Sequence, residues 1–200
     1  MDQVVQGKAV RVEFIIRRVF VIWHQEQSML RSARENGPAA LVPLAWLVVA
    51  AAHLGAVSPQ ALTIAHGVMS TLLAVFALLS WREMSTGALR GWRTIIVAGF
   101  GVTLLGLVGL TSGPDALLGV SLFGWMVLPA IGFAYTGRLI ANADAGGASH
   151  YTLAAVLTVA GTVVYAGGSL TGSVTAALLV GLGLVGVGQT IGIADATLRP

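Results

Sequence analysis

Cysteine is absent from this chain of 200 residues, and lysine occurs once, at Lys8. The lack of cysteine excludes disulfides, thiol catalysis and thiolate metal sites. Charged residues make up only 10% of the sequence, whereas a soluble domain has about 25%. Hydrophobic residues make up 56%, which is more apolar surface than a water-soluble globule of this size could bury. The chain is therefore predicted to be a membrane protein whose main partner is the lipid bilayer.

Long apolar stretches recur along the chain, each with the roughly 20 residues needed to cross a hydrocarbon core of about 30 Å. They cover 39–57, 61–80, 94–112, 116–137, 151–168 and 173–193. All eleven Lys and Arg residues lie before the first stretch, between the second and third, between the fourth and fifth, or after the sixth. Because cationic residues are retained on the cytoplasmic side, we expect a multi-pass cell-membrane protein with both termini cytoplasmic. Its basic character then reflects a rim facing anionic lipid, with no nucleic-acid partner.

Residues 8–36 are predicted to form an amphipathic helix that lies in the cytoplasmic interface. On a helical wheel the apolar residues from Val12 to Leu30 gather on one face, and charged residues lie opposite. Alternation at the start of this segment leaves a strand as the competing interpretation. Arginines interrupt the segment, which is not the pattern of a cleavable signal peptide. The predicted organisation is an interfacial helix over 1–37 and a six-helix transmembrane domain over 38–200.

Short turns after the first, third and fifth stretches predict three antiparallel helical hairpins. Gly55, Gly109 and Gly167 lie near these turns at nearly equal spacing, and a glycine at a helix C-terminus permits a left-handed cap. Pro59 and Pro114 begin the returning helices, where the missing N–H of proline costs nothing. The spacing predicts an internal repeat, although glycine and proline also collect at any tight membrane turn. The predicted fold is all-α, with six transmembrane helices as three repeated hairpins after an amphipathic interfacial helix.

Glycines punctuate the third and sixth stretches, from Gly99 to Gly113 and from Gly181 to Gly192. Several spacings near four or five residues align small faces and let helix backbones approach closely. Two interpretations stay open: tight packing inside one bundle, or a surface for homo-oligomerisation or for lining a pore.

His53 and His66 are the sharpest candidates for function, because ionisable residues inside a membrane are functional candidates by default. They flank the first outer turn on neighbouring helices, about 6–9 Å below the outer end at about 1.5 Å per residue. They could serve as structural hydrogen-bonding groups, as a proton-responsive pair, since imidazole titrates near pH ~6.5, or as a metal or haem site. Haem is awkward because packed helices lie only about 8–10 Å apart, and two histidines make an incomplete zinc site. Asp115 could be their polar partner in the second outer turn, but it more simply caps the following helix.

The remaining ionisable residues predict no chemistry. Asp195, near the cytoplasmic end of the last stretch, and His150, just before the fifth, are predicted to be solvated. Hydrolase, metalloprotease and nucleotide-binding motifs are absent, and so are paired carboxylates at a common depth. We therefore expect a protein that is not an enzyme, with no catalytic residues and no cofactor.

The second hairpin carries a family resemblance. It reads GWRTIIVAGFGVTLLGLVGLTSGPDALLGVSLFGWMVLPAIGFAYTGRL over residues 91–139, with Gly-Leu runs, a proline at the turn and a Trp/Gly pair in mid-helix. The chain ends in the similar run GLGLVGVGQTIGIADATLR. Over roughly residues 39–199 the sequence resembles the HdeD family of six-span membrane proteins. The resemblance implies a role in acid resistance and stress response, and it assigns no catalytic residue.

Two other functions stay open at this stage. An interfacial helix followed by six spans also resembles the permease of type-2 ABC exporters, and the inner loop 81–89 is similar to their first cytoplasmic loop. Only Arg90 to Arg93 separate that loop from the third stretch, which leaves little surface for docking an ATPase. The other alternative is a redox or metal-bearing membrane subunit that ligates haem or metal through His53 and His66.

Overall fold

The computed structural model describes residues 39–143, 146–171 and 175–198, and every regular element within them is a helix. The predicted all-α fold is confirmed for this part of the chain. Within these described ranges, five helices are long and apolar enough to cross a membrane. They are α2 (Pro59–Ser80), α3 (Gly87–Ser112), α4 (Asp115–Asn142), α5 (Ala148–Leu170) and α6 (Thr175–Leu198). The amphipathic helix predicted over 8–36, like the alternative strand at its start, lies outside the described residues.

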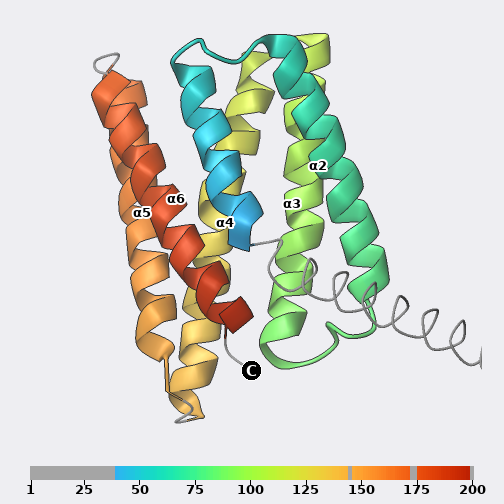
Figure 1. Cartoon of the computed structure of the whole chain (residues 1–200), viewed down its shortest axis with the longest axis vertical. Coiled ribbons are helices and arrows are strands. Elements are labelled where there is room, and N and C mark those ends of the chain that lie inside the picture. The colour runs from blue at the N-terminus through green and yellow to red at the C-terminus, as the bar shows by residue number, and fades with distance from the viewer. Residues whose placement is uncertain (1–38, 144–145, 172–174, 199–200) are drawn as a thin grey trace, which may run out of the picture. The chain divides into compact units, whose positions relative to one another are not determined.

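The helices from Leu41 onward pack as one unit, and each of α2 to α6 packs against its neighbour in sequence. Figure 1 shows α5 and α6 as an antiparallel pair, with the helix Ala39–His53 (blue) standing between that pair and the α2–α3 pair. We call the end that carries the turns after His53, Ser112 and Leu170 the outer end, following the orientation predicted from the sequence. Trp46 anchors the Ala39–His53 helix to a core made with Met126, Tyr165, Leu182 and Val185.

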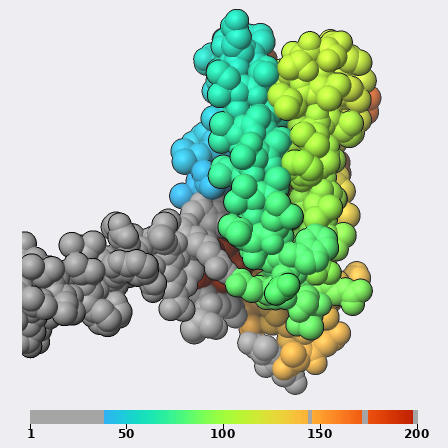
Figure 2. All heavy atoms as spheres, turned by 90° about the vertical axis from the view of Figure 1, so that its right-hand side faces the viewer, coloured from blue at the N-terminus to red at the C-terminus, as the bar shows by residue number. Residues whose placement is uncertain are grey.

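The surface of this bundle is apolar along the length of its helices. Figure 2 shows α2 and α3 side by side on one face. On α2, Leu79 is 77% exposed, and Ile64 and Val68 are exposed as well. Contiguous apolar surface of this extent is not tolerated on a soluble monomer, whereas lipid solvates it. The architecture is consistent with an integral membrane protein.

The first helix differs from the prediction of a full span over residues 39–57. Among the described residues it covers Ala39–His53. It ends because Gly55 adopts a left-handed φ of 72°. The Gly55 N–H donates to the Ala52 carbonyl at 3.0 Å and the Ala56 N–H to the Ala51 carbonyl at 2.9 Å. These two bonds form a Schellman cap, so the cap predicted at Gly55 is confirmed.

The equivalent caps predicted at Gly109 and Gly167 are wrong. Both residues lie inside helices, and α3 ends instead at Gly113, whose φ is 108°, while α5 ends at Thr171 with a right-handed conformation. Gly109 is a packing residue, since an added Cβ would lie 2.9 Å from the Leu118 backbone nitrogen of α4. Each of these helices continues for about one turn beyond its glycine before the chain reverses. Equal spacing therefore does not mark equal roles, and internal duplication stays a prediction.

At the inner end the helices continue past the apolar stretches. The connection predicted over 81–93 is reduced to 81–86, and Arg90 and Arg93 lie on α3. The Arg93 guanidinium donates to the Trp81 carbonyl at 3.1 Å and lies 4.5 Å from the centre of the Trp81 ring. Nothing requires a helix to end where the lipid ends, because its backbone hydrogen bonds are internal. Arg90 and Arg93 therefore sit on the first turns of α3, whereas Arg82 lies in the connection itself.

Glycines bring α5 and α6 into direct backbone contact. An added Cβ on Gly161 would lie 2.6 Å from the Gly181 carbonyl oxygen and 2.7 Å from the Val185 nitrogen, and one on Gly188 would lie 2.9 Å from the Ala154 carbonyl oxygen. These positions show tight packing within one bundle, which was one of the two interpretations of the glycine spacing. Gly101 of α3 and Gly183 of α6 have open space instead, and self-association through such faces stays a prediction.

Replacing Gly161 with Ala should destabilise the bundle, because the new methyl group would meet backbone atoms that no rotamer change can move. We expect a loss of about 1–3 kcal/mol, the usual cost of overpacking. Gly167→Ala on the same helix is the matched control, since its Cβ would have nothing within 4 Å. Unfolding in detergent micelles measures both variants. Equal stabilities for the two would contradict the close α5–α6 contact.

Candidate functional site

Polar groups buried between apolar helices are the candidates for function in this fold, because they are expensive to keep in a membrane. Several buried hydroxyls are satisfied within their own helix. Thr103 donates to the Gly99 carbonyl and Thr158 to the Ala154 carbonyl, each at 2.7 Å. Such back-bonding needs no partner from another helix. The groups that connect different helices are therefore the informative ones, and they include Gln189 and His53.

Gln189 joins three helices near the middle of the bundle. Its Oε1 accepts a hydrogen bond from the Trp46 indole at 3.0 Å, and its Nε2 donates to the Trp125 backbone carbonyl at 2.8 Å. That carbonyl lacks its normal partner because Pro129, four residues later in α4, has no N–H. A free carbonyl in hydrocarbon costs several kcal/mol. Gln189 of α6 thus supplies the hydrogen bond that Pro129 removes from α4.

Trp125 extends this connection to α3. Its indole N–H donates to Thr103 Oγ1 at 2.9 Å, and the same ring covers Gly99, where an added Cβ would lie 2.8 Å from it. The hydrogen-bonded chain of Trp46, Gln189, Trp125 and Thr103 therefore runs from the Ala39–His53 helix through α6 and α4 to α3.

His53 connects the first helix to α5. Its Nδ1 lies 2.8 Å from the Val49 carbonyl oxygen and its Nε2 lies 2.8 Å from the Tyr165 hydroxyl. A carbonyl oxygen only accepts, so Nδ1 carries the proton, and in the neutral imidazole Nε2 accepts the Tyr165 O–H. The two rings meet edge to face, with centroids 5.6 Å apart. The neutral form of His53 is thus fully hydrogen bonded.

The His66 imidazole is oriented in the same way, by a hydrogen bond from Nδ1 to a carbonyl of its own helix, but it packs against different helices. Its Nδ1 lies 2.9 Å from the Leu62 carbonyl oxygen, which leaves Nε2 as an acceptor. The ring packs over Gly106 of α3, where an added Cβ would lie 2.8 Å from Nε2 and 2.6 Å from Ser121 Oγ of α4. His66 Nε2 and Ser121 Oγ therefore lie around the same point above Gly106.

The structure gives His53 and His66, which were predicted to act together with Asp115, separate neighbours. Each imidazole has its own interhelical neighbour, Tyr165 for His53 and Ser121 for His66, and no hydrogen bond between the two is recorded among the described residues. Their joint response to protons stays a prediction. The cap predicted at Asp115 is wrong, since Pro114 occupies the N-cap position of α4 and no side chain caps it. Asp115 instead lies in the first turn of α4, where its negative charge interacts favourably with the positive end of the helix dipole.

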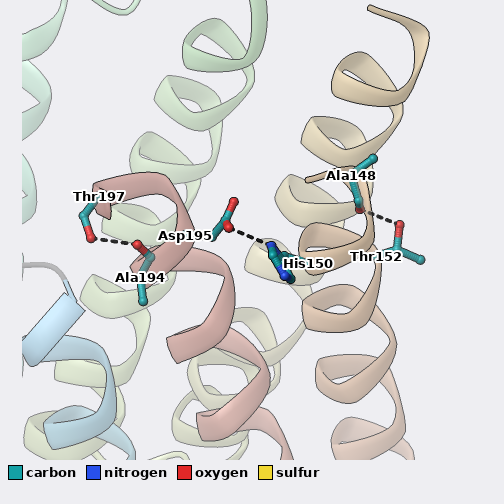
Figure 3. Close-up of polar contacts among 6 residues, drawn as sticks. All are labelled: Ala148, His150, Thr152, Ala194, Asp195 and Thr197. Atoms are coloured by element: carbon teal, nitrogen blue, oxygen red, sulfur yellow. Dashed lines mark hydrogen bonds and ion pairs between the residues drawn. The ribbon is translucent and has the colours of Figure 1, made fainter. Parts of the chain in front are cut away.

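His150 and Asp195, both predicted from the sequence to be solvated, form a pair that links α5 to α6 at the inner end. Figure 3 shows His150, at the start of α5, facing Asp195 near the end of α6. Nδ1 and Oδ1 are 2.9 Å apart, and the Asp195 side chain is only 12% exposed, against 55% for His150. The prediction that Asp195 is solvated is therefore wrong. The residues lie 45 positions apart in the chain, and the one signal that could have paired them is their common position at the inner end of one hairpin.

Metal and haem binding have little support in this geometry. No group of three or more His, Asp or Glu side chains able to hold a metal ion occurs within the part of the chain that the structure describes. Both nitrogens of His53 already have partners, so a ligated iron would have to displace the Tyr165 hydroxyl or the Val49 carbonyl. The described residues therefore add no further ligand to His53 and His66 for the alternative of a metal-bearing or haem-bearing subunit.

Comparisons of the chain with family models, with curated proteins and with solved structures found no match. The class that the fold defines is that of a multi-pass helical membrane protein, and the resemblance to the HdeD family stays a prediction.

A double-mutant cycle tests the link between Pro129 and Gln189. Gln189→Leu alone leaves the Trp125 carbonyl and the Trp46 indole without partners, and we expect it to cost about 1–3 kcal/mol of unfolding free energy. Pro129→Ala restores an N–H that can donate to the Trp125 carbonyl. In that background Gln189→Leu should cost about 1 kcal/mol less. Strictly additive unfolding free energies in detergent would show that Pro129 and Gln189 do not share this carbonyl.

Proposed function

We propose that this protein is a non-enzymatic integral membrane protein that supports tolerance to acid and envelope stress. The observation that carries the proposal is the imidazole of His53, which bridges the Val49 carbonyl and the Tyr165 hydroxyl in the outer half of the bundle. The contact joins the Ala39–His53 helix to α5 through an imidazole, whose nitrogens donate or accept according to its protonation. The HdeD resemblance agrees with this function, because that family is associated with acid resistance.

Protonation inverts the role of one atom in this contact. When His53 takes a second proton, Nε2 becomes a donor, and the Tyr165 oxygen must accept. The Tyr165 proton then needs another acceptor in surroundings that are mainly apolar, with the Phe123 ring edge-on at a centroid distance of 5.6 Å. An unsatisfied donor there is costly. Acid therefore weakens the attachment of the Ala39–His53 helix to α5, and this change is the signal that the proposal assigns to the protein.

The proposal requires an orientation in which both termini are cytoplasmic and the His53 end faces outward. The basic residues Arg90, Arg93 and Arg138 lie toward the inner ends of α3 and α4, as the retention of cations on the cytoplasmic side demands.

Single cysteines test this orientation directly, since the chain has none of its own. Gln60→Cys and Asp115→Cys lie at the outer ends of α2 and α4, and Ser85→Cys and Asn142→Cys lie at the inner end. In intact cells a membrane-impermeant maleimide should label the first two and should reach the others only after permeabilisation. The reverse pattern would place His53 on the cytoplasmic side and end the proposal.

Tyr165→Phe tests the function without removing the ring that packs against Phe123. The variant loses the hydroxyl that His53 Nε2 accepts from, so we expect survival and cytoplasmic pH after an acid shift to fall to the level of cells lacking the protein. His53→Gln should behave in the same way. Tyr135→Phe, at an exposed position of α4, is the matched control and should behave as wild type. Normal acid tolerance in both Tyr165→Phe and His53→Gln would remove the proton-responsive role.

A further inference from the structure

The seam between α2, α3 and α4 contains two buried hydroxyls that differ from the nearby threonines of α2 and α3. Ser70 of α2 is 7% exposed and Ser121 of α4 is 2% exposed. Thr63, Thr71 and Thr103 donate to the carbonyl four residues earlier, yet no such bond is recorded for either serine. The buried Oγ of Ser70 has no hydrogen-bond partner among the described residues. These hydroxyls are thus available to a partner that is not part of either helix.

His66 supplies the third polar group of this seam. With Nδ1 committed to the Leu62 carbonyl, its Nε2 is an acceptor. It lies beside Ser121 Oγ above Gly106, and no direct hydrogen bond joins the two atoms in the described structure. Ser70 follows His66 by four residues, so it lies on the same face of α2, one turn further from the outer end. An acceptor and two hydroxyls therefore line one buried seam inside otherwise apolar helices.

We propose that a water molecule binds in this seam and bridges His66 Nε2 to Ser121 Oγ, with Ser70 Oγ as the next polar group inward. Buried water is held where a site is polar and offers two or more hydrogen-bonding partners. Water can donate to Nε2 while it accepts from the serine hydroxyl, which satisfies both atoms at once. Gly106 is needed because any side chain there would occupy the space around Nε2 and Oγ.

This site goes beyond the proposed function, which uses the contact of His53 with Tyr165. The helices that line the seam carry few other ionisable residues. On α3 there is none between Arg93 and the helix end at Ser112, and the closest one in sequence on α4 is Asp115, six residues before Ser121. On α2 itself His66 is the only ionisable residue. His66 is therefore the ionisable residue that α2 contributes to the seam.

The test is NMR detection of magnetisation transfer from water to the imidazole of His66 in lipid nanodiscs, with histidine labelled by nitrogen-15 and His66 assigned from His66→Gln. We expect a clear water contact at His66 in the wild-type protein. Ser121→Ala, which removes the hydroxyl without adding volume, should reduce it several-fold. Gly106→Ala should abolish it, and Gly101→Ala, on the same helix with nothing within 4 Å of its Cβ, should leave it unchanged.

Absence of the contact in the wild type, or an unchanged contact in Ser121→Ala, would overturn the site. If Gly106→Ala does not fold, Ser121→Ala decides alone. The measurement is independent of acid tolerance. A water contact in a protein whose His53 and Tyr165 variants keep normal acid survival would leave the site standing and remove the proposed function.

Discussion

The hydrogen bond from Gln189 to the Trp125 carbonyl is the interaction on which the rest of the described fold depends. Pro129 removes the N–H that would satisfy this carbonyl inside α4, and hydrocarbon offers no water to replace it. The amide of Gln189 donates to the carbonyl at 2.8 Å and accepts from Trp46 at 3.0 Å. One side chain of α6 thus joins α4 and the first helix by hydrogen bonds. Apolar contacts alone specify such positions poorly in lipid, because lipid tails are as apolar as leucine.

The position of the outer histidines follows from this arrangement. The attachment of the Ala39–His53 helix includes the Trp46 hydrogen bond, the packing of Trp46 against Gly186, where an added Cβ would lie 3.2 Å away, and the bond of His53 to Tyr165. Two of these contacts are hydrogen bonds. One of the two is made by an imidazole, whose Nε2 changes from acceptor to donor on protonation, which is why His53 rather than a surface residue is central to the proposed function.

The helices could be predicted from the sequence because an apolar run of span length in lipid has no alternative to helix. The cap at Gly55 could be predicted too, since it depends on local backbone conformation. The contacts that decide the site could not be predicted in this way. Whether a glycine such as Gly109 caps a helix or packs against one depends on the neighbouring helix. His150 and Asp195 meet only when α5 is placed against α6. Pro129 and Gln189 were both visible in the sequence, but their relation depends on which carbonyl faces which helix.

The central claim is that Gln189 satisfies the Trp125 carbonyl, and solid-state NMR measures this distance most directly. In bilayers, protein labelled with nitrogen-15 in glutamine side chains and carbon-13 in tryptophan carbonyls should show a dipolar coupling between one such pair. The coupling should correspond to a hydrogen-bonded amide and should vanish in Gln189→Leu. If the wild-type protein shows no coupling between any glutamine side chain and any tryptophan carbonyl, Gln189 does not donate to the Trp125 carbonyl, and the central claim is contradicted.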